Sequence, residues 1–158
     1  MQKITVSVIG SHDKNGKVDY ISHEVGRIVA EMGCVLVCGG LSGVMEAASK
    51  GAREAGGLTI GLLPGKDKAD ANPYIDIALP TTIGYARNAL VAGAADIIIA
   101  LPGSHGTNSE ICYGLVFGRP VIDLGGWNLP GMIPLKDVED LREILTACIR
   151  DIRARAAA

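Results

Sequence analysis

The sequence is poor in aromatic residues, which make up 4% of its 158 residues, and it has no block rich in lysine and arginine. A formal net charge of -2 argues against a general binder of nucleic acids or membrane surfaces, because such proteins present clustered positive charge. No apolar run is long enough to cross a bilayer, and the first residues carry no signal-peptide pattern. We therefore expect a cytoplasmic protein without nucleic-acid or membrane partners.

The cysteines form no C-x-x-C pair, so the sequence lacks the spacing of a redox motif or a zinc ribbon. Cys34 and Cys38 share one face of an expected strand, but two ligands without a partner cluster make a poor zinc site. We predict no metal site and interpret the cysteines as free thiols in a reducing compartment. They are Cys34, Cys38, Cys112 and Cys148.

Two common nucleotide-binding motifs are also missing. The pattern G-x-G-x-x-G does not follow the first expected strand, residues 3–9, which weakens the case for an NAD- or FAD-dependent oxidoreductase. Residues 61–67 (GLLPGKD) are one residue short of a P-loop and lack the serine or threonine after the lysine. The sequence therefore does not predict a P-loop NTPase.

What the sequence does contain is 21 glycines and 48% hydrophobic residues, which suggest a closely packed α/β domain. Apolar segments alternate with amphipathic ones, and this predicts a single-domain, doubly wound (Rossmann-type), mainly parallel sheet with helices on both faces. We expect residues 1–158 to form one nucleotide-binding domain of this type. Strands are expected at residues 3–9, 34–38, 58–63, 75–79, 96–101 and 121–122. Helices are expected from about residues 18, 44, 82 and 137, with Ser42 and Thr82 as caps, and a further helix ends near residue 117.

Residues 101–110 (LPGSHGTNSE) follow an apolar run without interruption and predict a strand, a tight turn and a helix start. Gly103 and Gly106 would let the backbone approach a ligand closely, and the free N–H groups of the helix would point at an anion. This stretch predicts a phosphate cradle.

Glycine-bearing turns also follow two other expected strands, at residues 10–13 and 39–43. Right-handed crossovers place every strand-to-helix loop on one rim of the sheet, and ligands bind there near the topological switch point. Three turns on one rim are more informative than one glycine turn alone. The candidate ligand-binding residues are Gly10, Ser11, Gly39, Gly40, Ser42, Gly43, Arg87, Asn88, Pro102, Gly103, Ser104, His105, Gly106 and Thr107.

Arg87 and Glu110 are the candidate catalytic residues. Both are expected in early turns of helices that follow consecutive strands, so they should face the same rim about one strand spacing apart. A cation near a helix N-terminus is unfavourable for the helix dipole, which is easier to understand if Arg87 meets an anion.

Structural roles compete with these functional ones. Thr107 and Glu110 have the T-x-x-E spacing of a capping box, and Arg87 could pair with a neighbouring carboxylate. His12 and His105 lie on the predicted rim, where a histidine could contact a ligand or remain a solvated loop residue. His23 is expected on an exposed helix without a role.

These motifs resemble a known superfamily. The family motif P-G-G-x-G-T-x-x-E is similar to residues 102–110, its upstream arginine matches Arg87, and its glycine loop resembles residues 39–46. The superfamily contains the Lonely Guy cytokinin-activating phosphoribohydrolases, long labelled possible lysine decarboxylases, and the shorter molybdenum cofactor carrier proteins. The resemblance covers most of residues 4–122 and implies a homodimer or a higher homo-oligomer.

Three departures from the hydrolases favour the carrier-like branch. Ser104 replaces the second glycine of the motif, Asn88 follows Arg87 where hydrolases usually carry lysine, and Cys38 replaces the first glycine of a triplet. The resemblance then implies a binder of a phosphate-bearing pterin or nucleotide-like ligand, with the molybdenum cofactor as a candidate cargo. The alternative is a phosphoribohydrolase that uses Glu110 and Arg87 to cleave nucleoside 5′-monophosphates to base and ribose 5-phosphate. A lysine decarboxylase is disfavoured because no pyridoxal-phosphate lysine is recognisable.

Overall fold

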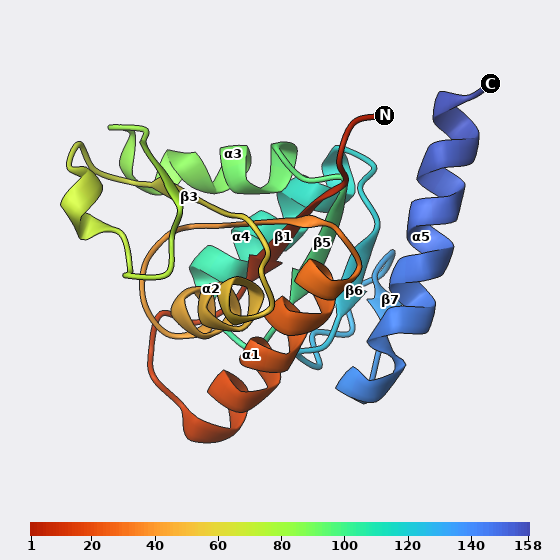
Figure 1. Ribbon diagram of the computed structural model, residues 1–158, viewed down its shortest axis with the longest axis horizontal. Coiled ribbons are helices and arrows are strands. Elements are labelled where there is room, and N and C mark those ends of the chain that lie inside the picture. Colours follow the sequence, from red (N-terminus) through yellow and green to blue (C-terminus); the bar gives the residue numbers. More distant parts are fainter.

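The computed structural model describes residues 1–158 as one seven-stranded sheet with helices on both faces (Figure 1). All neighbouring strands are parallel, in the order β4-β3-β2-β1-β5-β6-β7. The predicted doubly wound α/β sheet is confirmed, with one strand more than expected, because two residues of β7 give no hydrophobic pattern. The strands are β1 (Thr5–Ile9), β2 (Val35–Cys38), β3 (Thr59–Leu63), β4 (Ile77–Pro80), β5 (Ile97–Ala100), β6 (Val121–Asp123) and β7 (Ile133–Pro134).

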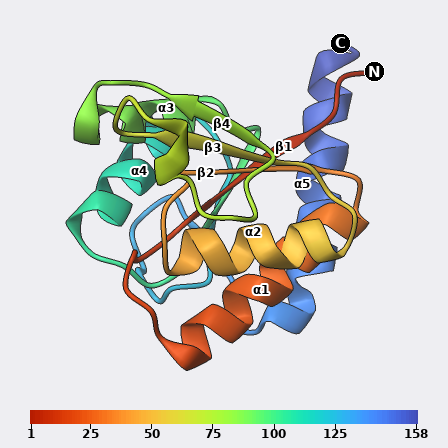
Figure 2. The same ribbon diagram turned by 60° about the vertical axis from the view of Figure 1, so that its left-hand side comes forward.

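Five α-helices cover the sheet in two layers (Figure 2). The first, second and fifth helices contribute to the larger apolar core on one face, while the third and fourth pack on the other face. None of them combines the length and apolar composition that a membrane span requires. The helices are α1 (Gly16–Glu31), α2 (Val44–Glu54), α3 (Arg87–Gly93), α4 (His105–Val116) and α5 (Leu141–Ala156). Short 3-10 turns are η1 (Lys68–Asp70), η2 (Gly84–Ala86) and η3 (Val138–Asp140).

The central strand β5 shows how both cores are filled. Successive side chains of a strand point to opposite faces. Ile97 and Ile99 therefore enter the core under α1, α2 and α5, whereas Ile98 and Ala100 enter the core under α3 and α4. All four are fully buried, which explains why this segment is apolar throughout rather than alternating.

Helices α1 and α2 pack against each other at two glycines. A Cβ atom on Gly26 would lie 1.9 Å from the carbonyl oxygen of Ala48, and one on Gly51 would lie 2.0 Å from that of His23. Any side chain at either position would push the two helices apart. Glycine is therefore required here by the close approach of two backbones.

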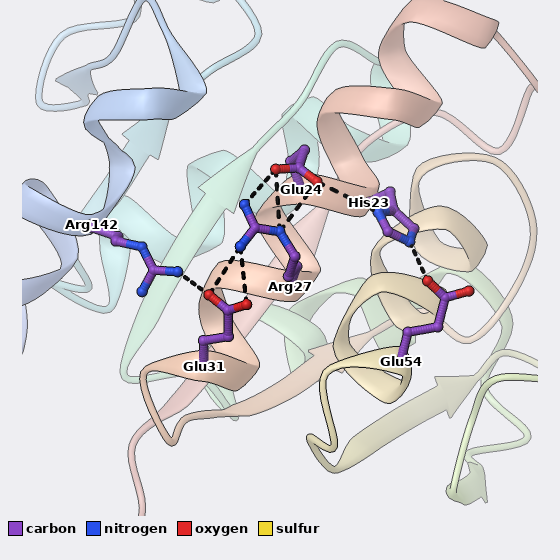
Figure 3. A network of polar contacts seen from close by, with 6 residues as sticks. All are labelled: His23, Glu24, Arg27, Glu31, Glu54 and Arg142. Carbon is purple, nitrogen blue, oxygen red and sulfur yellow. Dashed lines mark hydrogen bonds and ion pairs between the residues drawn. The ribbon is translucent and has the colours of Figure 1, made fainter.

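Ion pairs run along the surface of α1 and link it to α5 and α2, as Figure 3 shows. Arg27 pairs with Glu24 at 2.6 Å and with Glu31 at 3.0 Å, and Arg142 of α5 also pairs with Glu31. The expectation that His23 has no role is wrong. Its Nε2 atom lies 2.7 Å from Glu54, and this contact links α1 to α2.

Both predicted helix caps are wrong. Ser42 donates its hydroxyl to the carbonyl oxygen of His12 at 2.7 Å, and the N-cap of α2 is Gly43, which has a φ of 66°. Thr82 has a φ of 66° and donates its hydroxyl to the carbonyl oxygen of Thr81. Each hydroxyl is bonded to a loop carbonyl oxygen, that of His12 in the loop after β1 for Ser42 and that of the preceding residue for Thr82, so neither reaches the N–H groups of the following helix.

The two chain termini lie near one another at one end of the molecule (Figures 1 and 2). Strand β1 starts at this end, so its carboxyl end and the loop that follows lie at the opposite edge of the sheet.

Candidate functional site

Strands β1 and β5 mark the topological switch point of the sheet. The chain builds outward from β1 through β2 and β3 to β4, then returns to place β5 on the other side of β1. The loops after β1 and β5 are joined, because the amide of Ser11 donates to the carbonyl oxygen of Pro102 at 2.9 Å. The glycine loop after β2 is joined to them, since the amide of Val44 donates to the carbonyl oxygen of Ser11 at 2.9 Å. The three predicted turns therefore lie together.

A cavity of about 800 Å³ opens at this place. Ten of the residues predicted for the site line it: Gly10, Ser11, Gly39, Arg87, Asn88, Ser104, His105, Gly106, Thr107 and Glu110. The others do not line this cavity: Gly40, Ser42, Gly43, Pro102 and Gly103. A smaller cavity of about 340 Å³ adjoins it and shares Ser11 and Ser104 with it.

Three glycines that do not line the cavity are required by the backbone of the loops that form its wall. A Cβ atom on Gly103 would lie 2.1 Å from the hydroxyl oxygen of Thr107, and Gly40 and Gly43 have φ angles of 79° and 66°. Ser104 differs, because its φ of -124° is open to any residue. The serine in place of the second motif glycine is thus compatible with the backbone of the turn.

Helix α4 points its first turn at the cavity. Ser104 is its N-cap, and Asn108 is the first residue whose amide donates within the helix, to the carbonyl oxygen of Ser104 at 3.0 Å. The three preceding amides, of residues 105–107, have no intrahelical partner and carry the positive end of the helix dipole. The alternative role of Glu110 in a capping box is not found, since Thr107 lies within the first turn and Glu110 in the second.

Arg87 enters the cavity from the first residue of α3 and is 7% exposed. Its Nε atom donates to the carbonyl oxygen of Leu62 at 2.8 Å, and its Nη2 atom donates to that of Gly39 at 3.4 Å. No carboxylate forms an ion pair with it, so the alternative of a structural pairing with a carboxylate is not found. Burial lowers the pKa of Arg87, but a guanidinium stays protonated in proteins.

Asn88 fixes the orientation of Arg87. Its Oδ1 atom accepts a hydrogen bond from Nη1 of Arg87, and its Nδ2 atom donates to Ser109 at 3.2 Å and to the carbonyl oxygen of Gly106 at 3.5 Å. A lysine at this position could not accept the bond from Arg87, because its ammonium group is only a donor. Asn88 therefore connects the guanidinium to the start of α4.

Arg87 and Glu110 line the same cavity, but not for the predicted reason. They follow β4 and β5, which are consecutive in the chain yet separated in the sheet by β3, β2 and β1. They come together because α3 runs back over the sheet and packs against α4. Two strands that are consecutive in the chain are therefore not neighbours in this sheet, and the expected separation of one strand spacing between them is wrong.

Glu110 is 7% exposed, and its carboxyl group has neither a hydrogen bond nor an ion pair. Burial raises the pKa of Glu110 to about 8, while the charge of Arg87 acts in the opposite direction. The side chain is therefore mainly a neutral carboxylic acid at pH 7. It can donate a proton in this form, whereas it cannot act as a base.

The sequence did not predict the apolar part of the cavity wall. Leu41, Met45, Tyr85 and Tyr113 line it, and Tyr85 is 88% exposed at the mouth. The position of Tyr113 could have been found, because residues three apart on a helix are neighbours and Glu110 precedes it by three. The wall thus combines polar turns with aromatic and aliphatic side chains. No cluster of three or more histidine, cysteine or acidic side chains is arranged to hold a metal ion.

Almost the whole chain, including the residues of the cavity, is similar to known proteins. The model of the SLOG cluster4 family matches residues 3–148. A protein of Archaeoglobus fulgidus without a characterised function is 40% identical over 124 residues, which are 78% of this chain and 82% of that protein.

Two solved structures are similar over almost the whole chain. The molybdenum cofactor binding protein from the phototrophic bacterium Rippkaea orientalis has a TM-score of 0.89 and 32% identity, and the match covers 94% of this chain and 99% of that chain. The molybdenum cofactor carrier protein from Chlamydomonas reinhardtii has a TM-score of 0.86 and 29% identity, with the same coverage of 94% and 99%.

Proposed function

This chain belongs to the SLOG cluster4 family, and from that premise we propose that it binds a small phosphate-bearing ligand in the cavity at the β1/β5 switch point. The ligand class that we favour is a phosphorylated pterin of the molybdenum cofactor type, held as cargo. A nucleotide-like ligand offers the same phosphate to the same groups.

The observation that carries this proposal is the unpaired charge of Arg87. The guanidinium is almost completely buried, yet only carbonyl and amide oxygens contact it. A buried cation without a counter-ion is costly, and an anion in the cavity removes that cost. A guanidinium has five N–H donors, of which the contacts with Leu62, Gly39 and Asn88 use three. Two donors remain for a ligand.

The start of α4 supports the same ligand class. Three amides without an intrahelical partner and the positive end of a twelve-residue helix face the cavity from the side of Ser104. Phosphate groups bind at such helix starts because the amides donate to their oxygens. The cavity volume of about 800 Å³ also lies in the range that encloses a ligand of this size.

The relatives favour a pterin over other phosphorylated ligands. Two proteins that share 29–32% identity with this chain over nearly all of its length are described as binding or carrying the molybdenum cofactor. The aromatic and aliphatic wall formed by Leu41, Met45, Tyr85 and Tyr113 suits a planar ring system beside the phosphate site.

The test is retention of the pterin by the purified protein. The protein is expressed in a host that makes the cofactor, and the fluorescence of the oxidised pterin is measured after denaturation. We expect the Arg87→Lys variant to retain at least about tenfold less pterin than wild type, because lysine keeps the charge but loses the planar donor geometry. Arg119→Lys, at a residue outside the cavity, is the matched control. Equal retention by wild type and Arg87→Lys contradicts the proposal.

A second candidate function is favoured by one observation. A neutral carboxylic acid beside a buried cation could protonate the leaving base of a nucleoside 5′-monophosphate, as the acid of a glycosidase does. Glu110 is such an acid. Release of ribose 5-phosphate from AMP by wild type, lost in Glu110→Gln, would establish this hydrolase activity and displace the pure carrier.

We also propose a homodimer, or a higher homo-oligomer, formed through α3 and α4. The supporting observation is a set of exposed apolar side chains in residues 83–90 and 113–117, two of which, Tyr85 and Tyr113, also line the cavity. Val116 is 79% exposed, and the rings of Tyr113 and Phe117 stack with centroids 5.9 Å apart on the same helix. The others are Ile83, Tyr85 and Leu90.

A further inference from the structure

Glu110 is a buried titratable side chain of the cavity that has no hydrogen-bond or ion-pair partner in the chain. The residue is 7% exposed and lines the cavity, and its carboxyl group is contacted by no hydrogen-bond donor or cation of the chain within bonding distance. Buried polar groups are normally satisfied, because the water that they lose must be replaced. A ligand that supplies the missing partner explains why this carboxyl group is placed here.

The groups around Glu110 restrict which partner that is. Arg87 is the nearby charge, but its contacts hold it on Leu62, Gly39 and Asn88 rather than on Glu110. Cys38, behind the cavity wall, accepts from the amide of Gly40 and lies 3.6 Å from the hydroxyl of Ser49. The remaining titratable side chains that line the cavity form no bond with Glu110. They are His12, His105, Tyr85 and Tyr113.

We propose that Glu110 binds the ligand as a neutral carboxylic acid, donating a hydrogen bond to an uncharged acceptor atom that lies beside the ligand's phosphate-bearing group. This inference rests on the proposed function and adds what the ligand must offer: a carbonyl oxygen, a ring nitrogen or an ether oxygen near its anionic end. It also assigns Glu110 the role of a specificity-determining residue, since a ligand without an acceptor atom at this place would leave the O–H donor of the acid unpaired.

Proton and ligand binding are coupled in this arrangement. An anion in the cavity makes the ionised form of Glu110 still less favourable, so the bound state holds the proton more firmly than the free state. Burial raises the pKa of Glu110 to about 8 in the free protein, which supports the same direction. Affinity is therefore constant below pH 8 and falls above it, by about tenfold per pH unit once the free carboxyl group is ionised.

The experiment measures AMP binding by titration calorimetry between pH 7 and pH 9.5 for wild type, Glu110→Gln and Glu110→Met. The 5′-phosphate is a dianion throughout this range, because its second pKa is about 6. We expect wild type to lose affinity above pH 8 and to take up roughly half a proton at pH 8, seen as a dependence of the heat on the buffer. The glutamine variant also has a donor and should bind without pH dependence. The methionine variant, which has no donor, should bind at least about tenfold more weakly at pH 7.

Each other outcome is decisive. A flat or rising pH profile in wild type, or a glutamine variant that binds tenfold more weakly at pH 7, overturns the inference. A carboxyl carbon of Glu110 that titrates near pH 4.5 by NMR overturns it independently of any ligand. If wild type binds neither AMP nor inorganic phosphate, the proposed phosphate site fails and the inference fails with it. Circular dichroism confirms that each variant is folded.

Discussion

Arg87 and Glu110 are each left with an unmet interaction, and both interactions point into one cavity. Arg87 is buried without a counter-ion, although three oxygen atoms orient it. Glu110 is buried without a hydrogen bond, and burial raises the pKa of its carboxyl group to about 8. The fold orients both side chains but supplies neither a counter-ion for Arg87 nor a hydrogen-bond partner for Glu110. We therefore assign both partners to a ligand.

The unpaired carboxyl group should make stability depend on pH. The pKa of Glu110 is about 8 in the folded chain and close to 4.5 when unfolded, so the folded state binds the proton more tightly. The free energy of unfolding should therefore fall as pH rises from about 4.5 through 8, by up to roughly 5 kcal/mol at 1.36 kcal/mol per pKa unit. Glu110→Gln should remove this loss. Urea unfolding at pH 5, 7 and 9 measures it, and a constant difference between the two proteins across this range would contradict the assignment.

Substitutions at the two neighbouring positions of the motif turn should destabilise the fold to very different extents. Gly103→Ala places a Cβ atom against Thr107 and should cost about 1–3 kcal/mol of stability, together with ligand binding. Ser104→Gly should cost only a few tenths of a kcal/mol, because glycine is also accepted at an N-cap. Thermal unfolding of both variants measures the contrast. A Gly103→Ala variant as stable as Ser104→Gly would show that the turn can move.

Among the elements, the contact between α1 and α2 should be highly sensitive to added side-chain volume. Gly26→Ala should lower stability by at least about 2 kcal/mol, because its Cβ atom meets the backbone of Ala48 rather than a movable side chain. Gly16→Ala is the matched control on the same helix, since nothing lies within 4 Å of the added atom. The control should be neutral or more stable by up to about 1 kcal/mol. Denaturant midpoints that shift equally in both variants would contradict the steric account.

How far the sequence could predict each element depended on whether its information was local. The run Ile97–Ala100 predicted a buried strand correctly, because a strand covered on both faces is apolar throughout. Gly33 predicted the end of α1, and its φ of 75° is the conformation that ends helices. The predicted caps were wrong because each hydroxyl donates to a carbonyl oxygen instead, that of His12 in another loop for Ser42 and that of Thr81 for Thr82.

The candidate site was predictable in composition and not in arrangement. Glycine turns and residues 102–110 indicated the rim where the cavity lies, because all strand-to-helix loops of a parallel sheet share one rim. The position of Arg87 required the order of the strands and the return of α3 over the sheet, which no local pattern contains. Nor could the sequence tell that Glu110 has no partner, since its spacing from Thr107 is that of a capping box.

At the scale of the whole molecule, the apolar surface on α3 and α4 should determine assembly. Val116→Lys, at a side chain that is 79% exposed, should convert the proposed homo-oligomer into a monomer, because an interface tolerates a buried unpaired charge poorly. Tyr20→Lys is the control, since Tyr20 is 68% exposed on α1, away from these helices. Light scattering gives the molar mass. A monomeric wild type would contradict the proposed oligomer.

The position of the two chain ends makes them suitable sites for attaching a label or a fusion partner. Both lie at the end of the molecule where β1 begins, while the cavity opens at the opposite edge of the sheet. A fluorophore, a surface anchor or a fused reporter at either end would therefore leave the ligand entrance unobstructed. The nearness of the ends also means that a short linker could join them, so that a new start could be opened elsewhere on the surface.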